Sequence, residues 1–159
     1  MKNIKGETNV KSLRFGSGSI RGIGKEIGKF IVVTMEVPWK LVKNDIGRQP
    51  EEIIFISTVD QDTLNKLIVS MPQIDSVIGI GGGMAIDAAK YFSWKKNIRL
   101  ISIPTIVSVD AFLTPAAGVR SENKVIYIGN SSPDPLIIDY DVIRTAPKTL
   151  NVAGGGDLL

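Results

Sequence analysis

Short apolar runs alternate with longer helix-like stretches along most of this chain, and no other feature constrains the fold as strongly. The helix-like stretches cover residues 36–47, 60–71 and 84–96. Each apolar run is hydrophobic on both faces, as the strands of a parallel sheet are when helices cover both sides. The predicted strands are Ile31 to Thr34, Ile53 to Ile56, Val77 to Ile80 and Leu100 to Ile103. We therefore predict an α/β fold, a doubly wound, Rossmann-like parallel sheet.

The size and composition of the chain fit one domain of this kind. Its 159 residues are 43% hydrophobic, which is enough for a single core, and the length excludes a second full domain. A net charge of +3 from scattered basic residues does not mark a nucleic-acid-binding surface. No segment reaches the roughly 18 apolar residues that span a bilayer, and the N-terminus lacks the apolar stretch of a signal peptide. We expect a cytoplasmic protein without nucleic-acid or membrane partners.

Two absences limit the chemistry that the chain can perform alone. Without cysteine it has no disulfide framework and no thiolate metal site, which fits a reducing compartment. Without histidine it has no imidazole to bind a metal or to move a proton. Any imidazole chemistry must come from outside these residues.

The sharpest motif is a strand end followed by three glycines and a helix start, Gly81-Gly82-Gly83-Met84-Ala85-Ile86-Asp87. Glycines let the backbone come close to a pyrophosphate, and the first unpaired amides of the helix attract its negative oxygens. Asp87 and Lys90 share a helix face away from the alanines that pack on the core. The alternative is a flexible turn with an exposed ion pair, but three glycines exceed what a tight turn requires.

An earlier glycine-rich run, Gly16 to Gly22, only superficially resembles a dinucleotide-binding loop. Its glycine spacing is off by one, and Gly22 and Gly24 would weaken the helix that should follow. We predict a bend between an edge strand and a helix.

The segment after Pro104 carries hydroxyls and a carboxylate just past a buried strand, where ligands bind in open α/β sheets. Thr105 and Ser108 could bond a cofactor, and Asp110 could hold substrate hydroxyls. Local sequence favours capping and turn chemistry equally well. Beyond this segment we expect a hairpin around Val119 to Ile128, a strand at Leu136 to Ile138 and a helix after Pro147.

Asp157 is the one carboxylate in a glycine-rich helical segment, Ala153 to Leu159. Glycines are costly in a helix, so we expect the segment to have a function. A lone aspartate is nevertheless an ordinary polar helix residue by local physics.

Together these motifs resemble the superfamily of iron-containing alcohol dehydrogenases, glycerol and glycerol-1-phosphate dehydrogenases and 3-dehydroquinate synthases. The resemblance covers nearly the whole chain and rests on four ordered motifs: GGGxxxDxAK at 81–90, PTxxSxD at 104–110, PxxIxD at 135–139 with Asp139 one place early, and AGxGD at 153–157. It implies that the pyrophosphate of NAD or NADP is held at Gly81, Gly82, Gly83, Met84 and Ala85, and that Asp87, Thr105, Ser108 and Thr114 line the cofactor cleft. It also implies that Asp110 contacts substrate hydroxyls and that Asp157 is the first ligand of Zn²⁺ or Fe²⁺.

The chain departs from this family at three places. Met84 replaces the Ser or Lys that many members have after the glycines, and Thr34-Met35-Glu36 replaces an Asp that binds the adenosine ribose, so the choice between NAD and NADP stays open. The other metal ligands of the family are histidines on a following all-helical domain, which is absent here. We therefore expect residues 1–159 to be the N-terminal nucleotide-binding domain, ending just after the first metal ligand.

The expected parent enzyme is an NAD(P)- and metal-dependent dehydrogenase acting on a small polyol or polyol phosphate, of glycerol or glycerol-1-phosphate type. Its metal site is incomplete in this chain, which we expect to be inactive alone. The expected partners are the substrate and the missing helical domain, and a homo-oligomer of the chain stays open. Two alternatives stay open. One is a 3-dehydroquinate synthase-like lyase, against which Lys90 and Asp157 argue; the other is a stand-alone nucleotide-binding module.

Overall fold

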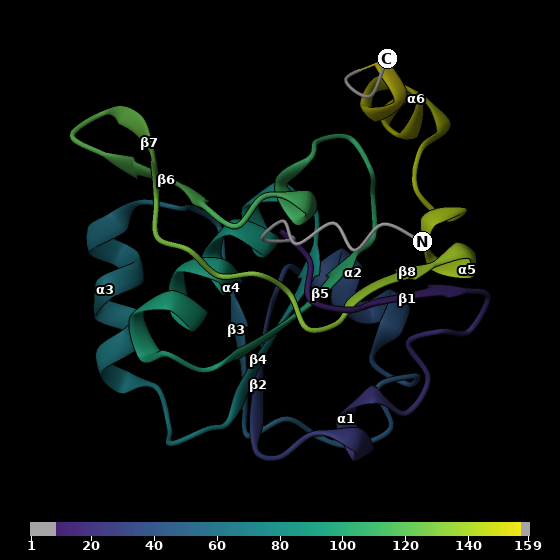
Figure 1. The fold of residues 1–159 in the computed structure, drawn as a ribbon, viewed down its shortest axis with the longest axis horizontal. Helices are drawn as coiled ribbons and strands as arrows, with labels where there is room; N and C mark the ends of the chain where they lie inside the picture. The colour runs from purple at the N-terminus through teal and green to yellow at the C-terminus, as the bar shows by residue number, and fades with distance from the viewer. Residues whose placement is uncertain (1–8, 157–159) are drawn as a thin grey trace, which may run out of the picture.

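The chain folds around a six-stranded sheet in which every paired strand runs parallel to its neighbour. The computed structural model describes residues 9–156 (Figure 1). The order of strands across the sheet is β1-β8-β5-β4-β2-β3. The strands are β1 (Leu13–Gly16), β2 (Phe30–Thr34), β3 (Glu52–Phe55), β4 (Ser76–Gly81), β5 (Arg99–Pro104) and β8 (Leu136–Asp139). This arrangement confirms the predicted α/β class with a Rossmann-like parallel sheet.

Helices cover both faces of the sheet, and each face has its own hydrophobic cluster. One cluster joins the sheet to α3 and α4 through residues such as Leu64 and Phe92. The other joins it to α1, α2 and α5 through residues such as Ile23, Val42 and Val142. The helices are α1 (Ile23–Glu26), α2 (Glu36–Val42), α3 (Gln61–Ser70), α4 (Gly83–Lys96), α5 (Tyr140–Ile143) and α6 (Lys148–Gly156), with a 3₁₀ turn η1 (Ala111–Leu113).

The strands in the middle of the sheet are buried as their sequences predict, but β3 is not. All residues of β2 and β4 are buried. In β3 only Ile54 is buried, and Phe55 is 52% exposed. The prediction that the run at residues 53–56 is covered on both faces is therefore wrong at Phe55, whereas Ile53 packs against one cluster and Ile54 and Ile56 belong to the other. The physical reason is position: β3 is the last strand of the sheet, so it has a neighbour on one side only.

The predicted hairpin forms a second, two-stranded antiparallel sheet from β6 (Ala117–Ser121) and β7 (Lys124–Ile128). Its tight turn uses Glu122 and Asn123, both at positive φ, as expected of a two-residue hairpin loop. Ala117 and Val119 pack into the cluster on the α3–α4 face. In Figure 1 the hairpin projects from the main sheet beside α3.

The early glycine-rich run forms the bend that was predicted between an edge strand and a helix. β1 lies at one edge of the sheet, and residues 17–22 turn from it into α1. The buried carboxylate of Asp139 holds this bend, since it accepts hydrogen bonds from the amides of Gly18 and Ile20, each at 3.2 Å. Within residues 9–156, no helix has the length and apolar character needed to cross a membrane.

Candidate functional site

The order of the strands places a ligand-binding crevice between β2 and β4. The chain leaves β2 for β3 toward one edge of the sheet, and it leaves β4 for β5 toward the other. Neighbouring strands whose connections diverge in this way leave a crevice outside their carboxyl ends, where open α/β sheets bind ligands. The carboxyl end of β4 is the glycine turn, and that of β2 is Thr34. The buried Thr34 hydroxyl donates to the Ile80 carbonyl oxygen at 2.9 Å and so ties the two strand ends together.

The glycine turn leads directly into the 14-residue helix α4. The first bond inside this helix runs from the Ile86 amide to the Gly82 carbonyl oxygen, at 3.1 Å. The amides of Gly83, Met84 and Ala85 precede that bond, so they belong to the first turn, whose N–H groups have no partner within the helix. With the positive end of the helix dipole, these amides form an anion-binding surface at the switch point.

Each glycine of the turn has a measurable reason to lack a side chain. Gly81 has φ of +143°, and a β-carbon there would lie 3.0 Å from the Ala85 β-carbon. At Gly82 and Gly83 an added β-carbon would lie 3.2 Å from Ile106 and 3.0 Å from Val109, respectively. The turn is therefore closely covered by the segment that follows β5. This close covering contradicts the alternative of a merely flexible turn.

An apolar hollow of 370 Å³ lies beside this crevice, beyond the carboxyl ends of β2 and β3. Its lining includes the exposed side chains of Met35, Val37 and Phe55. Glu36 adds a carboxylate to this lining. An apolar hollow rimmed by a few polar groups suits a flat ring carrying a sugar. A larger hollow of 730 Å³ lies elsewhere, around Asn97, Arg99 and Asp134, and includes none of the predicted site residues.

The hydroxyl-rich segment after β5 lies over the glycine turn, as its sequence predicts. The amide of Thr105 donates to the Gly81 carbonyl oxygen at 3.0 Å, and Thr105 is buried. Ser108 is half-buried and Asp110 is exposed. Asp110 lies close enough to Asp87 for its charge to act on that carboxyl. The structure therefore brings Thr105 and Asp110 to the same end of the sheet as the glycine turn and the start of α4.

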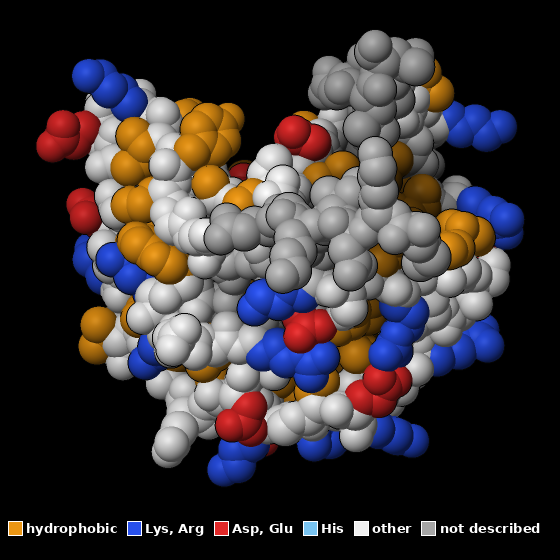
Figure 2. Space-filling model, in the orientation of Figure 1, with side chains coloured by type: hydrophobic (Ala, Val, Ile, Leu, Met, Phe, Trp, Pro, Cys, Tyr) orange, Lys and Arg blue, Asp and Glu red, His pale blue; other side chains and the backbone are white. Residues whose placement is uncertain are grey.

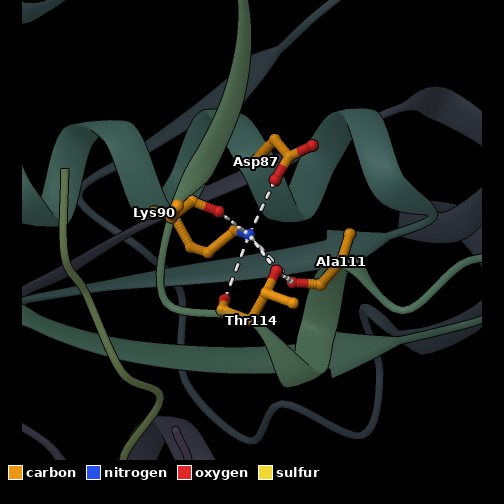
Figure 3. Close-up of polar contacts among 5 residues, drawn as sticks. Asp87, Lys90, Ala111 and Thr114 are labelled. Atoms are coloured by element: carbon orange, nitrogen blue, oxygen red, sulfur yellow. Dashed lines mark hydrogen bonds and ion pairs between the residues drawn. The ribbon is translucent and has the colours of Figure 1, made fainter. Parts of the chain in front are cut away.

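Asp87 and Lys90 form an ion pair that is buried rather than exposed. The Lys90 ammonium lies 2.8 Å from Asp87 Oδ1, and the two side chains are 2% and 18% exposed. Figure 3 shows the ammonium enclosed between α4 and the segment that contains Ala111 and Thr114. It donates to the carbonyl oxygens of Ala111 at 2.9 Å and Thr114 at 3.2 Å. The alternative of an exposed ion pair beside the glycines was therefore wrong.

Burial raises the pKa of Asp87 above its usual value. Desolvation of the carboxylate is the largest cause, and it outweighs the charge and hydrogen bond of Lys90 together with a backbone hydrogen bond from Gly118. The nearby Asp110 carboxylate acts in the same direction as burial. Acidic groups whose pKa is shifted by burial and by charged neighbours concentrate at functional sites.

The site opens into a cleft between the hairpin and α6. Figure 2 shows the surface hollowed there, with acidic and hydrophobic side chains in the hollow. Asn151 joins α6 to the segment after β5. Its side chain accepts a hydrogen bond from the Val107 amide at 3.3 Å and donates one to the Ile143 carbonyl oxygen at 3.0 Å. The glycine turn, the segment after β5 and the start of α4 lie together at the carboxyl end of β4.

The structure leaves the predicted metal ligand untested. Asp157 lies outside the described residues. Within residues 9–156, no cluster of three or more His, Cys, Asp or Glu side chains could hold a metal ion. The chain has no histidine at all.

Two residues of this region were not assigned a role from the sequence. The sequence marks Lys90 as a motif residue and as a partner of Asp87 without giving it a role in the site, yet it contacts the 111–116 segment as well. The only signal in the sequence is the position of this lysine within the run Ala88 to Ser93. The structure shows that every residue of this run is buried in α4. Asn151 joins α6 to the segment after β5, and no local pattern marks it.

Comparison with known proteins finds a family model and relatives that match the sequence of this chain. The family model for iron-containing alcohol dehydrogenase matches residues 23–147. The glycerol-1-phosphate dehydrogenase of Metallosphaera sedula is 34% identical over 136 residues, which cover 81% of this chain and 39% of that protein. The corresponding enzyme of Aeropyrum pernix is 41% identical over 87 residues, covering 55% of this chain and 25% of that protein.

Solved structures share the fold at lower sequence identity. Glycerol dehydrogenase from Schizosaccharomyces pombe superposes with a TM-score of 0.81 at 24% identity, covering 93% of this chain and 42% of that one. An iron-containing alcohol dehydrogenase from Corynebacterium glutamicum gives a TM-score of 0.83 at 18% identity, covering 98% and 47%.

The sheet and the glycine turn define a Rossmann-like α/β domain, and the comparisons identify the family to which it belongs. The chain belongs to the iron-containing alcohol dehydrogenase family. It spans less than half the length of the curated relatives it matches.

Proposed function

We propose that this chain is the N-terminal dinucleotide-binding domain of an NAD(P)-dependent dehydrogenase that oxidises a small polyol or polyol phosphate, of glycerol or glycerol-1-phosphate type. The observation that carries the proposal is the glycine turn Gly81–Gly83 at the switch point, with the first turn of α4 behind it. The names of its relatives, glycerol-1-phosphate dehydrogenase [NAD(P)+] among them, support both the cofactor and the substrate class. They also favour a dehydrogenase over a lyase.

The residues of the cleft fit a dinucleotide along its length. The amides of Gly83, Met84 and Ala85 would hold the pyrophosphate, because they are the free donors of the first turn of α4. The apolar hollow around Met35 and Phe55 would take the adenosine. Asp87, Thr105, Ser108 and Thr114 would line the cleft, and Asp110 would accept hydrogen bonds from substrate hydroxyls. When bound, the nicotinamide accepts the hydride that leaves the substrate.

A complete metal site does not fit the residues of this chain. A catalytic zinc ion usually has three protein ligands and an open position, and Asp157 would supply one. The remaining ligands would come from the part of the relatives' length that this chain does not match.

Dinucleotide binding tests the proposal directly. Calorimetry with NAD⁺, NADH, NADP⁺ and NADPH should show binding to the 159-residue chain, weaker than in a full-length relative because the chain matches less than half of such a relative's length. Gly82→Val should abolish it, since a side chain there meets Ile106 and obstructs the approach to the amides. Ser70→Ala, at the exposed end of α3, is the matched control. Unchanged binding by Gly82→Val would remove the glycine turn from the site.

A further inference from the structure

Lys90 is a buried cation to which the proposed function gives no role. It lies in the middle of α4, and its residue is 1% exposed. Lysine is almost never fully buried unless it is paired, because removing an ammonium group from water costs a great deal of free energy. The buried position therefore requires an explanation in the contacts of the ammonium group.

Five oxygen atoms surround this ammonium group (Figure 3). One is the Asp87 carboxylate, and three are the carbonyl oxygens of Ala111, Thr114 and Ala116. The fifth is the Thr114 hydroxyl, at 3.4 Å. An ammonium has only three N–H groups, so the oxygens outnumber the donors. Such a shell resembles the oxygen cages in which proteins hold hard cations.

The oxygens belong to two parts of the chain that Lys90 joins. Asp87 stands on the first turns of α4, directly behind the glycine turn. The other four oxygens belong to residues 111–116, an irregular segment between Asp110 and the hairpin strand β6. Within this segment the 3₁₀ turn has one backbone bond, from the Leu113 amide to the Asp110 carbonyl oxygen. A second backbone bond, from the Ser131 amide to the Pro115 carbonyl oxygen at 2.9 Å, ties the segment to residues further along the chain. Most of the other polar contacts of residues 111–116 are made by Lys90.

We infer that Lys90 is a positioning residue of the proposed cofactor site, its ammonium acting as a tethered cation that holds Asp87 and residues 111–116 in their binding arrangement. This inference rests on the proposed function. Without the charge, mutually repelling carbonyl dipoles would face an empty space and residues 111–116 would sample other paths. The apparent affinity for the dinucleotide then falls in proportion to the fraction of molecules that keep the binding arrangement.

The absence of cysteine makes a clean chemical test possible. Lys90→Cys introduces a single thiol, which can be alkylated in denaturant before refolding. The thiolate displaces bromide from 2-bromoethylamine, forming a carbon–sulfur bond and restoring an ammonium at the length of a lysine side chain. Alkylation with 1-bromopropane gives a neutral side chain of the same length, and 2-bromoethanol gives a neutral one with a hydroxyl tip. Lys96→Cys, exposed on the same helix, receives the same treatments as the matched control.

Two measurements on these proteins decide the question. Hydrogen exchange of the amides in residues 110–118 should match the native chain in the ammonium product and be faster in the neutral products. The dissociation constant for NAD⁺ should rise about tenfold or more in the neutral products, as it does when about a tenth of the molecules stays competent. The Lys96 products should agree with one another in both measurements.

Several outcomes would overturn the inference, and they differ from failure of the proposed function. Equal exchange and equal affinity in the ammonium and neutral products would show that the charge positions nothing. Refolding of the ammonium product alone would make Lys90 necessary for the whole fold and exclude a local role. If the native chain binds no dinucleotide, the proposed function fails, and the exchange measurement still decides whether Lys90 holds residues 111–116.

Discussion

Asp87 is a single carboxylate whose titration should be visible in the stability of the whole chain. Its pKa is raised above the usual 3.8, chiefly by burial. A raised pKa means that the folded chain holds this proton more firmly than the unfolded chain does. From pH 3.8 up to the raised pKa, the contribution of Asp87 to the free energy of unfolding therefore falls as pH rises.

Asp87→Asn should remove this dependence. The free energy of unfolding of the variant minus that of the native chain should grow as pH rises through this window and become constant above it. Urea unfolding at a series of pH values, followed by tryptophan fluorescence, measures the difference. Asp62→Asn, on the exposed first turn of α3, serves as the control. A difference that shrinks as pH rises would contradict the direction given for the pKa of Asp87.

Glu36 is the acidic residue that should decide between NAD and NADP. It lines the apolar hollow beside the cleft, 3.6 Å from Lys40 in an exposed ion pair. A carboxylate there would repel the 2′-phosphate of NADP, so we expect tighter binding of NAD. Glu36→Gln should raise the affinity for NADP about fivefold, as expected for about 1 kcal/mol between charges in water, and leave that for NAD nearly unchanged. Parallel calorimetry with both cofactors measures this, and a variant with an unaltered ratio would exclude Glu36 from the choice.

At the scale of elements, strand β4 and helix α4 pack very closely against each other behind the glycine turn. A β-carbon at Gly79 would lie 2.6 Å from the Ala89 β-carbon, a distance that real structures do not show. Neither atom can rotate away, so Gly79→Ala must move the helix off the strand. We expect it to lower the free energy of unfolding by about 1–3 kcal/mol, the usual cost of overpacking a core.

Thermal and urea unfolding of Gly79→Ala measure this cost. Gly82→Ala is the useful comparison, because its new methyl meets the Ile106 side chain at 3.2 Å, and that side chain can shift. The comparison variant should lose less stability than Gly79→Ala. Equal stability of Gly79→Ala and the native chain would show that the helix and strand have room to separate.

The elements differ in how much of them local sequence can predict. Apolar runs identify β2, β4 and β5 because their burial follows from composition alone. The exposure of β3 depends on its place at the sheet edge, which is a property of topology rather than of residues 52–55. The role of Lys90 depends on carbonyl groups 21 to 26 residues further along the chain. No pattern within α4 could reveal that packing, whereas the proposal of a phosphate site at the glycine turn follows from local sequence.

At the scale of the whole molecule, the chain spans less than half the length of its curated relatives. It has no histidine, and within residues 9–156 no acidic cluster could hold a metal ion. We therefore expect no detectable oxidation of glycerol or glycerol-1-phosphate by the 159-residue chain, with NAD⁺ or NADP⁺ and with or without Zn²⁺ or Fe²⁺. Reduced-cofactor absorbance measures this, with a full-length relative as the positive control. Metal-dependent turnover by a chain of verified mass would contradict it.

The strand order also determines when each strand can find its partner during synthesis of the protein. Among the described strands β1 pairs with β8 alone, and β8 begins at Leu136, 120 residues after β1 ends at Gly16. The four strands β2 to β5 are complete once residue 104 has left the ribosome, so they can associate first. Until β8 emerges, the backbone of β1 has no partner strand among the described residues. The first of the described strands to be translated can thus join the sheet only after the last of them.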